Sequence, residues 1–199
     1  RFVHILFGVL WIGLLYYFNF VQTEYFKDSE PSAKSDVVQK LVPNALWYFR
    51  WAAAFTFLTG LYLLYWLSIT VNIGIVLGSL MGTLMAANVW FVIWPNQKKV
   101  IAGAPDAADA GAKAGLASRT NTLFSLPMLY LMVFSAHGGS LPMIAVTDMT
   151  GLWVGIAIIV LIEANALFGK MNPLITSVKA VIHSGLLLTL VFGILVHYL

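Results

Sequence analysis

Four histidines are the first candidates for chemistry in this chain, because its long apolar stretches hold few other ionisable side chains. They are His4, His137, His183 and His197. A neutral imidazole nitrogen is a common ligand of haem iron, and at lipid depth it is less costly than a charged group. The alternative is that each histidine hydrogen-bonds to a neighbouring helix. The histidines therefore predict a non-covalent b-type haem, with interhelical hydrogen bonding as the competing interpretation.

Height within a membrane decides which histidines could share one haem, since both ligands lie at nearly the same level. His4 stands 18 residues above the inner end of the first apolar stretch, a rise of about 27 Å. His183 stands ten residues into the last stretch, a rise of about 15 Å. His183 and His197 share a helix face about 21 Å apart, a spacing similar to that in di-haem cytochromes b. We take His4 and His183 as the first-choice iron ligands, and the pairing with His137 or His197 stays open.

Glu163 is the one acidic residue well inside an apolar run, and two interpretations of it compete. Its carboxylate could reach the membrane boundary and pair with Lys170 or Lys179. Otherwise it serves a proton path or a ligand pocket, as intramembrane ionisable groups often do. Further polar side chains near the inner third are Asn88, Arg119 and Asn121. Together these residues predict a small inward-facing cavity, with Glu163, Asn121 and Arg119 as the candidate catalytic residues.

The elements that must position these side chains are membrane-spanning helices. Hydrophobic residues make up 60% of the 199 residues and charged residues 10%, whereas soluble domains carry about 25% charged residues. Six apolar stretches could each cross a hydrocarbon core: 2–22, 51–67, 72–94, 121–136, 152–168 and 174–198. Such continuous apolar runs are typical of helices and not of barrel strands. The sequence predicts an all-α, polytopic bundle of about six helices that forms one transmembrane domain over residues 1–199.

The distribution of basic residues orients this bundle. The connections on one side hold Lys27, Lys34, Lys40, Arg50, Lys98, Lys99, Lys113, Arg119, Lys170 and Lys179. The opposite side holds only Arg1 of the eleven basic residues. The positive-inside rule therefore predicts a multi-pass protein of the bacterial inner membrane with both termini outside. The net charge of +3 then reflects topology in the lipid bilayer, and we expect no nucleic-acid partner. The absence of cysteine excludes a covalent c-type haem.

Two longer connections lie on the basic side. Residues 26–40 are polar, and we expect a loop with a short helix there. Residues 95–119 begin with WPNQKKV, and Pro105 followed by Asp106 suits the start of a second short helix, which Gly111 and Gly115 would weaken.

A stripe of small residues marks the third apolar stretch. Gly74, Gly78 and Gly82 recur every four positions and continue in Ala86. Such a face lets another helix backbone approach closely, which is the common explanation. It could equally leave room for a flat cofactor, and in the haem hypothesis these glycines contact the macrocycle.

Three segments carry a resemblance to a known family. They are VHILFGVLWIGLLYYFNF, NVWFVIWPNQKKVIAG and ASRTNTLFSLPMLYLMVFSAH, and the second is the most specific. The chain resembles the membrane domain of the bacterial membrane-bound urate oxidase (urate hydroxylase) family. The resemblance implies redox chemistry and a cytochrome c domain after the last helix on the outer side. It also implies functional roles for His4 and His137, whereas a histidine frequent in the family is replaced here by Thr120.

Two functions follow as hypotheses. The first is a membrane-embedded haem b protein that transfers electrons or oxidises a small, purine-like substrate. Because the sequence ends at Leu199, we expect its electrons to pass to an external cytochrome c or to other membrane-complex subunits. The second is a non-catalytic accessory subunit of a respiratory or photosynthetic membrane complex. A transporter that uses Glu163 ranks last, because no inverted repeat is evident.

Overall fold

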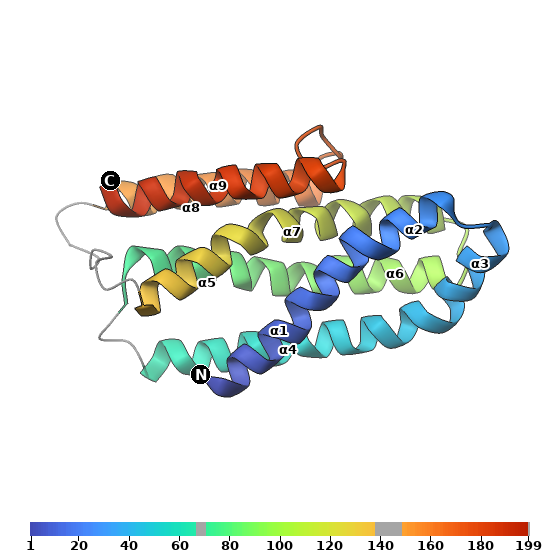
Figure 1. Ribbon diagram of the computed structural model, residues 1–199, viewed down its shortest axis with the longest axis horizontal. Coiled ribbons are helices and arrows are strands. Elements are labelled where there is room, and N and C mark those ends of the chain that lie inside the picture. Colours follow the sequence, from blue (N-terminus) through green and yellow to red (C-terminus); the bar gives the residue numbers. More distant parts are fainter. Residues whose placement is uncertain (67–70, 138–148, 199) are drawn as a thin grey trace.

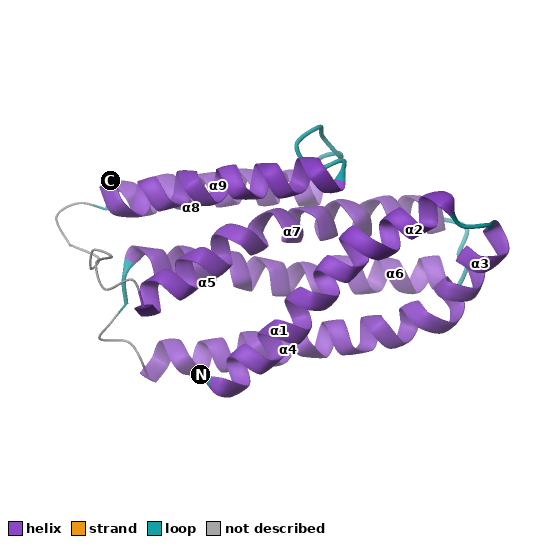
Figure 2. Cartoon of the chain, in the orientation of Figure 1, coloured by secondary structure: helices purple, strands orange, loops and turns teal. Residues whose placement is uncertain are grey.

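The computed structural model describes residues 1–66, 71–137 and 149–198, and these residues contain helices and no β-strand. Figure 2 shows that nearly all of the described chain is helical. The helices, with three π-helical segments written η, have the following bounds. They are α1 Phe2–Tyr16, η1 Tyr17–Gln22, α2 Thr23–Asp28, α3 Pro31–Asp36, η2 Val37–Leu41, α4 Val42–Trp66, α5 Ile73–Ala87, η4 Asn88–Ile93, α6 Trp94–Ile101, α7 Ala107–His137, α8 Thr150–Phe168 and α9 Val178–Tyr198.

Several of these elements join into longer helical rods. The first rod runs from α1 through η1 to α2, and the third runs from α5 through η4 to α6. Both rods are longer than the predicted apolar stretches: the first ends at Asp28 and not at residue 22, and the third ends at Ile101 and not at residue 94. The short helix expected within residues 26–40 is α3, and it continues through η2 directly into α4.

The connection predicted over residues 95–119 is mostly helical, which corrects the sequence-based expectation. The third rod continues through Pro95 to Ile101, and α7 begins at Ala107. The π-helical segment just before Pro95 shifts the hydrogen-bond register at the point where proline lacks an N–H. The start predicted at Pro105 and Asp106 is confirmed, but it opens the long α7 and not a separate short helix. The ammonium of Lys99 donates to Asp106 at 2.6 Å and thereby lowers the pKa of that carboxyl.

Helix α7 lies at the centre of the bundle. It packs against α1, α5, α6, α8 and α9, whereas α1 packs mainly against α4. Figure 1 shows α8 and α9 along one side of α7 and α4 on the other. Polar residues of α7 are consequently buried by protein: Thr120, Asn121, Thr122 and Ser125 are each at most 1% exposed.

Within the described ranges, four helical rods are long and apolar enough to cross a membrane: Phe2–Asp28, Ile73–Ile101, Thr150–Phe168 and Val178–Tyr198. Helices α4 and α7 occupy the two remaining predicted stretches and are more polar. The polar side chains of α7 lower its mean hydropathy. They are tolerated in a membrane helix because the surrounding helices shield them from lipid. Both termini lie at one end of the bundle, and the α2–α3, α6–α7 and α8–α9 connections lie at the other (Figure 1).

Candidate functional site

A cluster of polar side chains lies buried where η4, α7 and α8 meet. The side-chain amide of Asn88 donates to Asn121 Oδ1 at 3.0 Å and to Glu163 Oε2 at 3.2 Å. The amide of Asn121 in turn donates to the backbone carbonyl of Met85 at 2.9 Å. Asn88, Asn121 and Glu163 are 1%, 0% and 7% exposed. The structure thus brings together two residues that the sequence singles out, Asn121 and Glu163, through the amide of Asn88. We call these three residues the amide–carboxyl cluster.

Glu163 does not pair with Lys170 or Lys179, so that interpretation of the sequence is wrong. Among the described residues the ion pairs join other side chains, and the carboxyl of Glu163 accepts a hydrogen bond from Asn88. Glu163 cannot reach these lysines because it lies on the buried side of α8, which packs against α5 and α7. A buried carboxyl with an amide partner and no cation is suited to exchanging a proton.

Arg119 is buried but belongs to another face of α7. It precedes Asn121 by two residues, and two residues turn a helix by about 200°, so their side chains leave on nearly opposite sides. Arg119 is 5% exposed, and its Nη1 has no hydrogen-bond partner among the described residues. The predicted cavity that combines Arg119 with Asn121 and Glu163 is therefore not assembled as one group.

His4 joins α1 to α4 by hydrogen bonds. Its Nδ1 lies 2.9 Å from the carbonyl oxygen of Thr56 and 3.2 Å from the hydroxyl of Thr59. The bond to the carbonyl requires a proton on Nδ1, which leaves Nε2 as the unprotonated nitrogen of a neutral ring. Gly60 makes room for the ring, because a Cβ there would lie 3.2 Å from His4 Cε1. The ring also lines a cavity of about 240 Å³ with Tyr62.

The other three histidines lie on α7 and α9. His183 is exposed on α9, and His137 is exposed at the end of α7. The ring of His197 packs edge-on against Phe134 at 5.2 Å. Because α9 packs on α7 and α8 whereas His4 packs against α4, the described helices do not place His4 and His183 opposite each other. These positions do not fit a haem held by both residues within one chain. Nor do the described residues contain a group of three or more acidic or histidine side chains that could hold a metal ion.

The glycine stripe of α5 packs against α7. A Cβ on Gly78 would lie 3.3 Å from Leu131 Cβ, and a Cβ on Gly82 would lie 3.4 Å from Met128 Sδ. Gly74 is likewise buried. Helix packing therefore occupies the face that the haem hypothesis assigns to a macrocycle.

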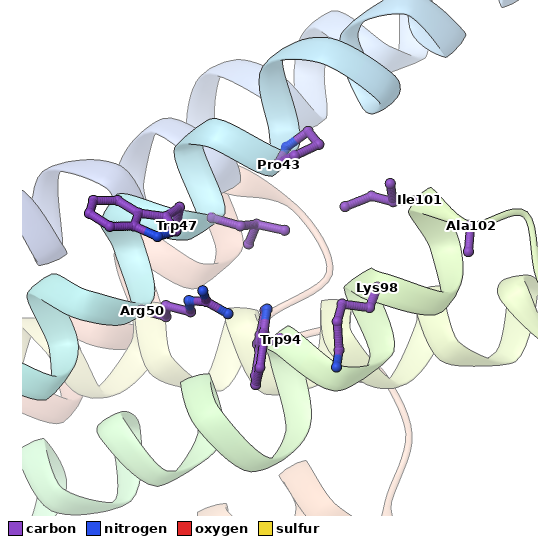
Figure 3. A pocket seen from close by; sticks show the side chains of 8 residues that line it. Pro43, Trp47, Arg50, Trp94, Lys98, Ile101 and Ala102 are labelled. Atoms are coloured by element: carbon purple, nitrogen blue, oxygen red, sulfur yellow. The ribbon is translucent and has the colours of Figure 1, made fainter.

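One group of aromatic and basic side chains was not predicted from the sequence. Arg50 of α4 lies over the ring of Trp94, which also receives Lys98 of α6 (Figure 3). In the sequence Arg50 is only one of the ten basic residues that orient the bundle. The spacing of four residues between Trp90, Trp94 and Lys98 is the signal that could have shown an aromatic and basic helix face.

The chain was compared with protein families, curated proteins and solved structures. A family model described as urate oxidase N-terminal matches residues 71–193, which is more than half of the chain. The matched segment contains the amide–carboxyl cluster, His137 and His183, and it excludes His4 and His197. Neither the curated proteins nor the solved structures contain a significant match.

Proposed function

This chain belongs to the urate oxidase N-terminal family, and from that premise we propose that it forms the membrane part of an oxidoreductase for urate or a similar purine. Hydroxylation of a purine takes its oxygen atom from water and releases two electrons and two protons. In this proposal the ionised carboxylate of Glu163 accepts one proton, solvent water accepts the other, and the two electrons pass to a cytochrome c-type acceptor on the outer side. The single observation that supports the proposal is the amide–carboxyl cluster, in which a carboxyl group hydrogen-bonded to an amide is buried within the segment that matches the family.

The cluster is suited to this task for a physical reason. A carboxyl group buried among helices is costly, and such groups in membrane segments usually serve a function. Asn88 orients the carboxyl through Oε2, and Asn121 holds Asn88 through Oδ1. The chain from Met85 through Asn121 and Asn88 to Glu163 therefore fixes the proton acceptor in one position. A haem is not part of the proposal, because the first-choice ligands, His4 and His183, are not placed opposite each other.

The proposal includes a topology in the bacterial inner membrane. In the part of the chain that the structure describes, four helical rods are long and apolar enough to cross it, and the basic connections lie at the end of the bundle opposite both termini (Figure 1). With the basic end in the cytoplasm, both termini lie outside, on the side where a cytochrome c-type acceptor would bind.

Turnover with an artificial acceptor tests the proposal. The purified chain in lipid nanodiscs is mixed with urate and ferricyanide, and both the loss of urate absorbance and the reduction of ferricyanide are recorded. We expect Glu163→Gln to lower kcat by about 10²–10⁴-fold, the usual contribution of a general base, with little change in KM. The control is Glu24→Gln, which alters an exposed carboxylate paired with Lys27 on α2. It should retain full turnover.

Two results would contradict the proposal. Full turnover in Glu163→Gln would remove the cluster from the reaction. A folded wild-type protein that reduces no acceptor in the presence of urate would instead indicate a non-catalytic accessory subunit. Thermal unfolding of each variant in detergent shows whether lost turnover reflects lost structure.

A further inference from the structure

A groove of about 480 Å³ separates α4 from α6 at the basic end of the bundle. Its walls are formed by Pro43, Leu46, Trp47, Arg50, Trp94, Lys98, Ile101 and Ala102 (Figure 3). Most of these side chains are apolar, and Arg50 and Lys98 are the two charged groups among them. The groove is separate from the amide–carboxyl cluster, which is buried between η4, α7 and α8.

The two cations of the groove share one aromatic ring. The guanidinium carbon of Arg50 lies 4.3 Å from the centre of the Trp94 ring, and Lys98 Nζ lies 4.2 Å from it. Such cation–π contacts hold a cation in place without using its N–H donors. Both cations are thus positioned while their hydrogen bonds remain available to an anion.

The positive charge of the groove is not balanced by protein. At the same end of the molecule Lys27 pairs with Glu24, Lys40 with Asp36 and Lys99 with Asp106. By contrast, neither Arg50 nor Lys98 has an acidic partner among the described residues. The Nε of Arg50 is also buried without a hydrogen-bond partner in that part of the chain. An anion in the groove would give Arg50 and Lys98 a negatively charged partner, and it would give Arg50 Nε a hydrogen-bond acceptor.

Two hydrogen bonds join the helical segments that form the walls of the groove. The indole Nε1 of Trp90 donates to the backbone carbonyl of Arg50 at 3.1 Å. At the other end the amide of Gln39 donates to the carbonyl of Ile101 at 2.8 Å. These two bonds join α4, and the η2 segment before it, to the η4–α6 rod on either side of the groove.

We propose that this groove binds the phosphate headgroup of an anionic phospholipid of the surrounding membrane. Arg and Lys are the side chains that recognise phosphate, and basic residues just inside the membrane attract anionic lipids. The apolar walls and the exposed indole of Trp47 favour a lipid over a free phosphate ion, because they can contact its glycerol and acyl groups. The inference goes beyond the proposed function and requires only that the helices lie in a membrane.

Native mass spectrometry tests lipid selection directly. The detergent-purified full chain is mixed with equal amounts of phosphatidylglycerol and phosphatidylcholine that carry identical acyl chains. We expect phosphatidylglycerol to predominate as the first bound lipid. Lys98→Gln should reduce that preference about fivefold, and Arg50→Gln with Lys98→Gln should reduce it about 25-fold, because each basic residue near the surface contributes comparably.

A matched pair of lysines provides the control. Lys34→Gln with Lys113→Gln removes the same charge from exposed positions at the same end, outside the groove. This variant should keep the wild-type preference. Trp94→Leu should lower the preference although it removes no charge, because it removes the ring that positions both cations.

Several outcomes would overturn the inference. One is equal binding of the two lipids by the wild type, and another is an equal loss of preference in the control pair. Competition by soluble glycerol phosphate at the concentrations at which the lipid binds would assign the groove to a free phosphate instead. Lys98 is exposed, so Lys98→Gln should fold normally and gives a result even where Arg50→Gln does not.

Discussion

At the scale of single residues, function depends on which polar side chains have partners. His4 is satisfied by the carbonyl of Thr56, the ordinary role of a histidine between two helices. Glu163 is instead held by the neutral amide of Asn88. The type of residue is therefore a weaker guide to chemistry than its partner, because an imidazole or a carboxyl behaves according to what it contacts.

Replacement of Asn88 by leucine tests the amide–carboxyl cluster. Asn88→Leu removes the donor to Glu163 and the donor to Asn121, and it leaves a buried carboxyl without its amide partner. We expect the free energy of unfolding to fall by about 1–3 kcal/mol. Denaturation by SDS of the protein in mixed micelles measures it.

Thr83→Val is the control for this change. Thr83 is exposed on α5, and its hydroxyl donates only to the Ser79 carbonyl of the same helix. Its replacement should alter the free energy of unfolding by less than about 0.5 kcal/mol. An equally small effect of Asn88→Leu would show that the cluster contributes nothing to stability.

At the scale of elements, two of the π-helical segments place a buried asparagine against α7. Asn19 of η1 donates to Ser118 at 2.8 Å, and Asn88 of η4 donates to Asn121 at 3.0 Å. A π-helical turn widens the helix and redirects its side chains, and such turns are frequent at functional sites. The two segments thus adapt the neighbouring helices to the polar stretch of α7.

The packing of α5 on α7 gives the prediction at this scale. In Gly78→Ala the new Cβ would meet Leu131 Cβ and Met132 Cγ at 3.3 Å, so the two helices must separate slightly. We expect the free energy of unfolding to fall by about 1–3 kcal/mol. Thermal unfolding in detergent, followed by circular dichroism, measures the change.

Gly115→Ala on α7 is the control, because alanine has free space at this position. A Cβ at Gly115 meets no atom of the described structure within 4 Å, and alanine favours a helix over glycine by about 0.5–1 kcal/mol. This variant should be slightly more stable than the wild type. If Gly78→Ala were also stabilising, the glycine stripe would not be a tightly packed helix contact.

At the scale of the whole molecule, the distribution of basic residues supports the proposed orientation. The basic connections gather at one end of the bundle, while both termini lie at the other (Figure 1). The groove of Arg50, Trp94 and Lys98 lies at the basic end, and in the proposed orientation this end meets the anionic headgroups of the cytoplasmic leaflet.

Single cysteines test this orientation, and the natural chain contains none that would interfere. Ala136→Cys lies at the end of α7 near the termini, and Lys34→Cys lies on α3 at the basic end; both positions are exposed. A membrane-impermeant thiol reagent should label Ala136→Cys in spheroplasts, and it should label Lys34→Cys only after lysis. The reverse pattern would invert the topology.

Much of the helical content could be predicted from the sequence alone. Apolar runs mark α1, α5, α8 and α9, because lipid-exposed helices must be apolar over most of their surface. The pair Pro105 and Asp106 marks the start of α7, because a proline and an acidic residue suit the first turn of a helix. The ten-to-one division of basic residues likewise predicts which ends of the helices lie together.

The partners of the polar residues were decided only by the tertiary structure. Glu163 is bound by Asn88, 75 residues earlier in the chain, and not by a lysine a few residues away. Arg50 meets Trp94 across two helices, and the glycine stripe meets α7. The hydropathy of a segment depends only on its own residues, so membrane-spanning helices can be predicted from the sequence. A hydrogen bond or a stacked cation depends on the rotation of two packed helices about their axes, and that rotation is set by the whole bundle.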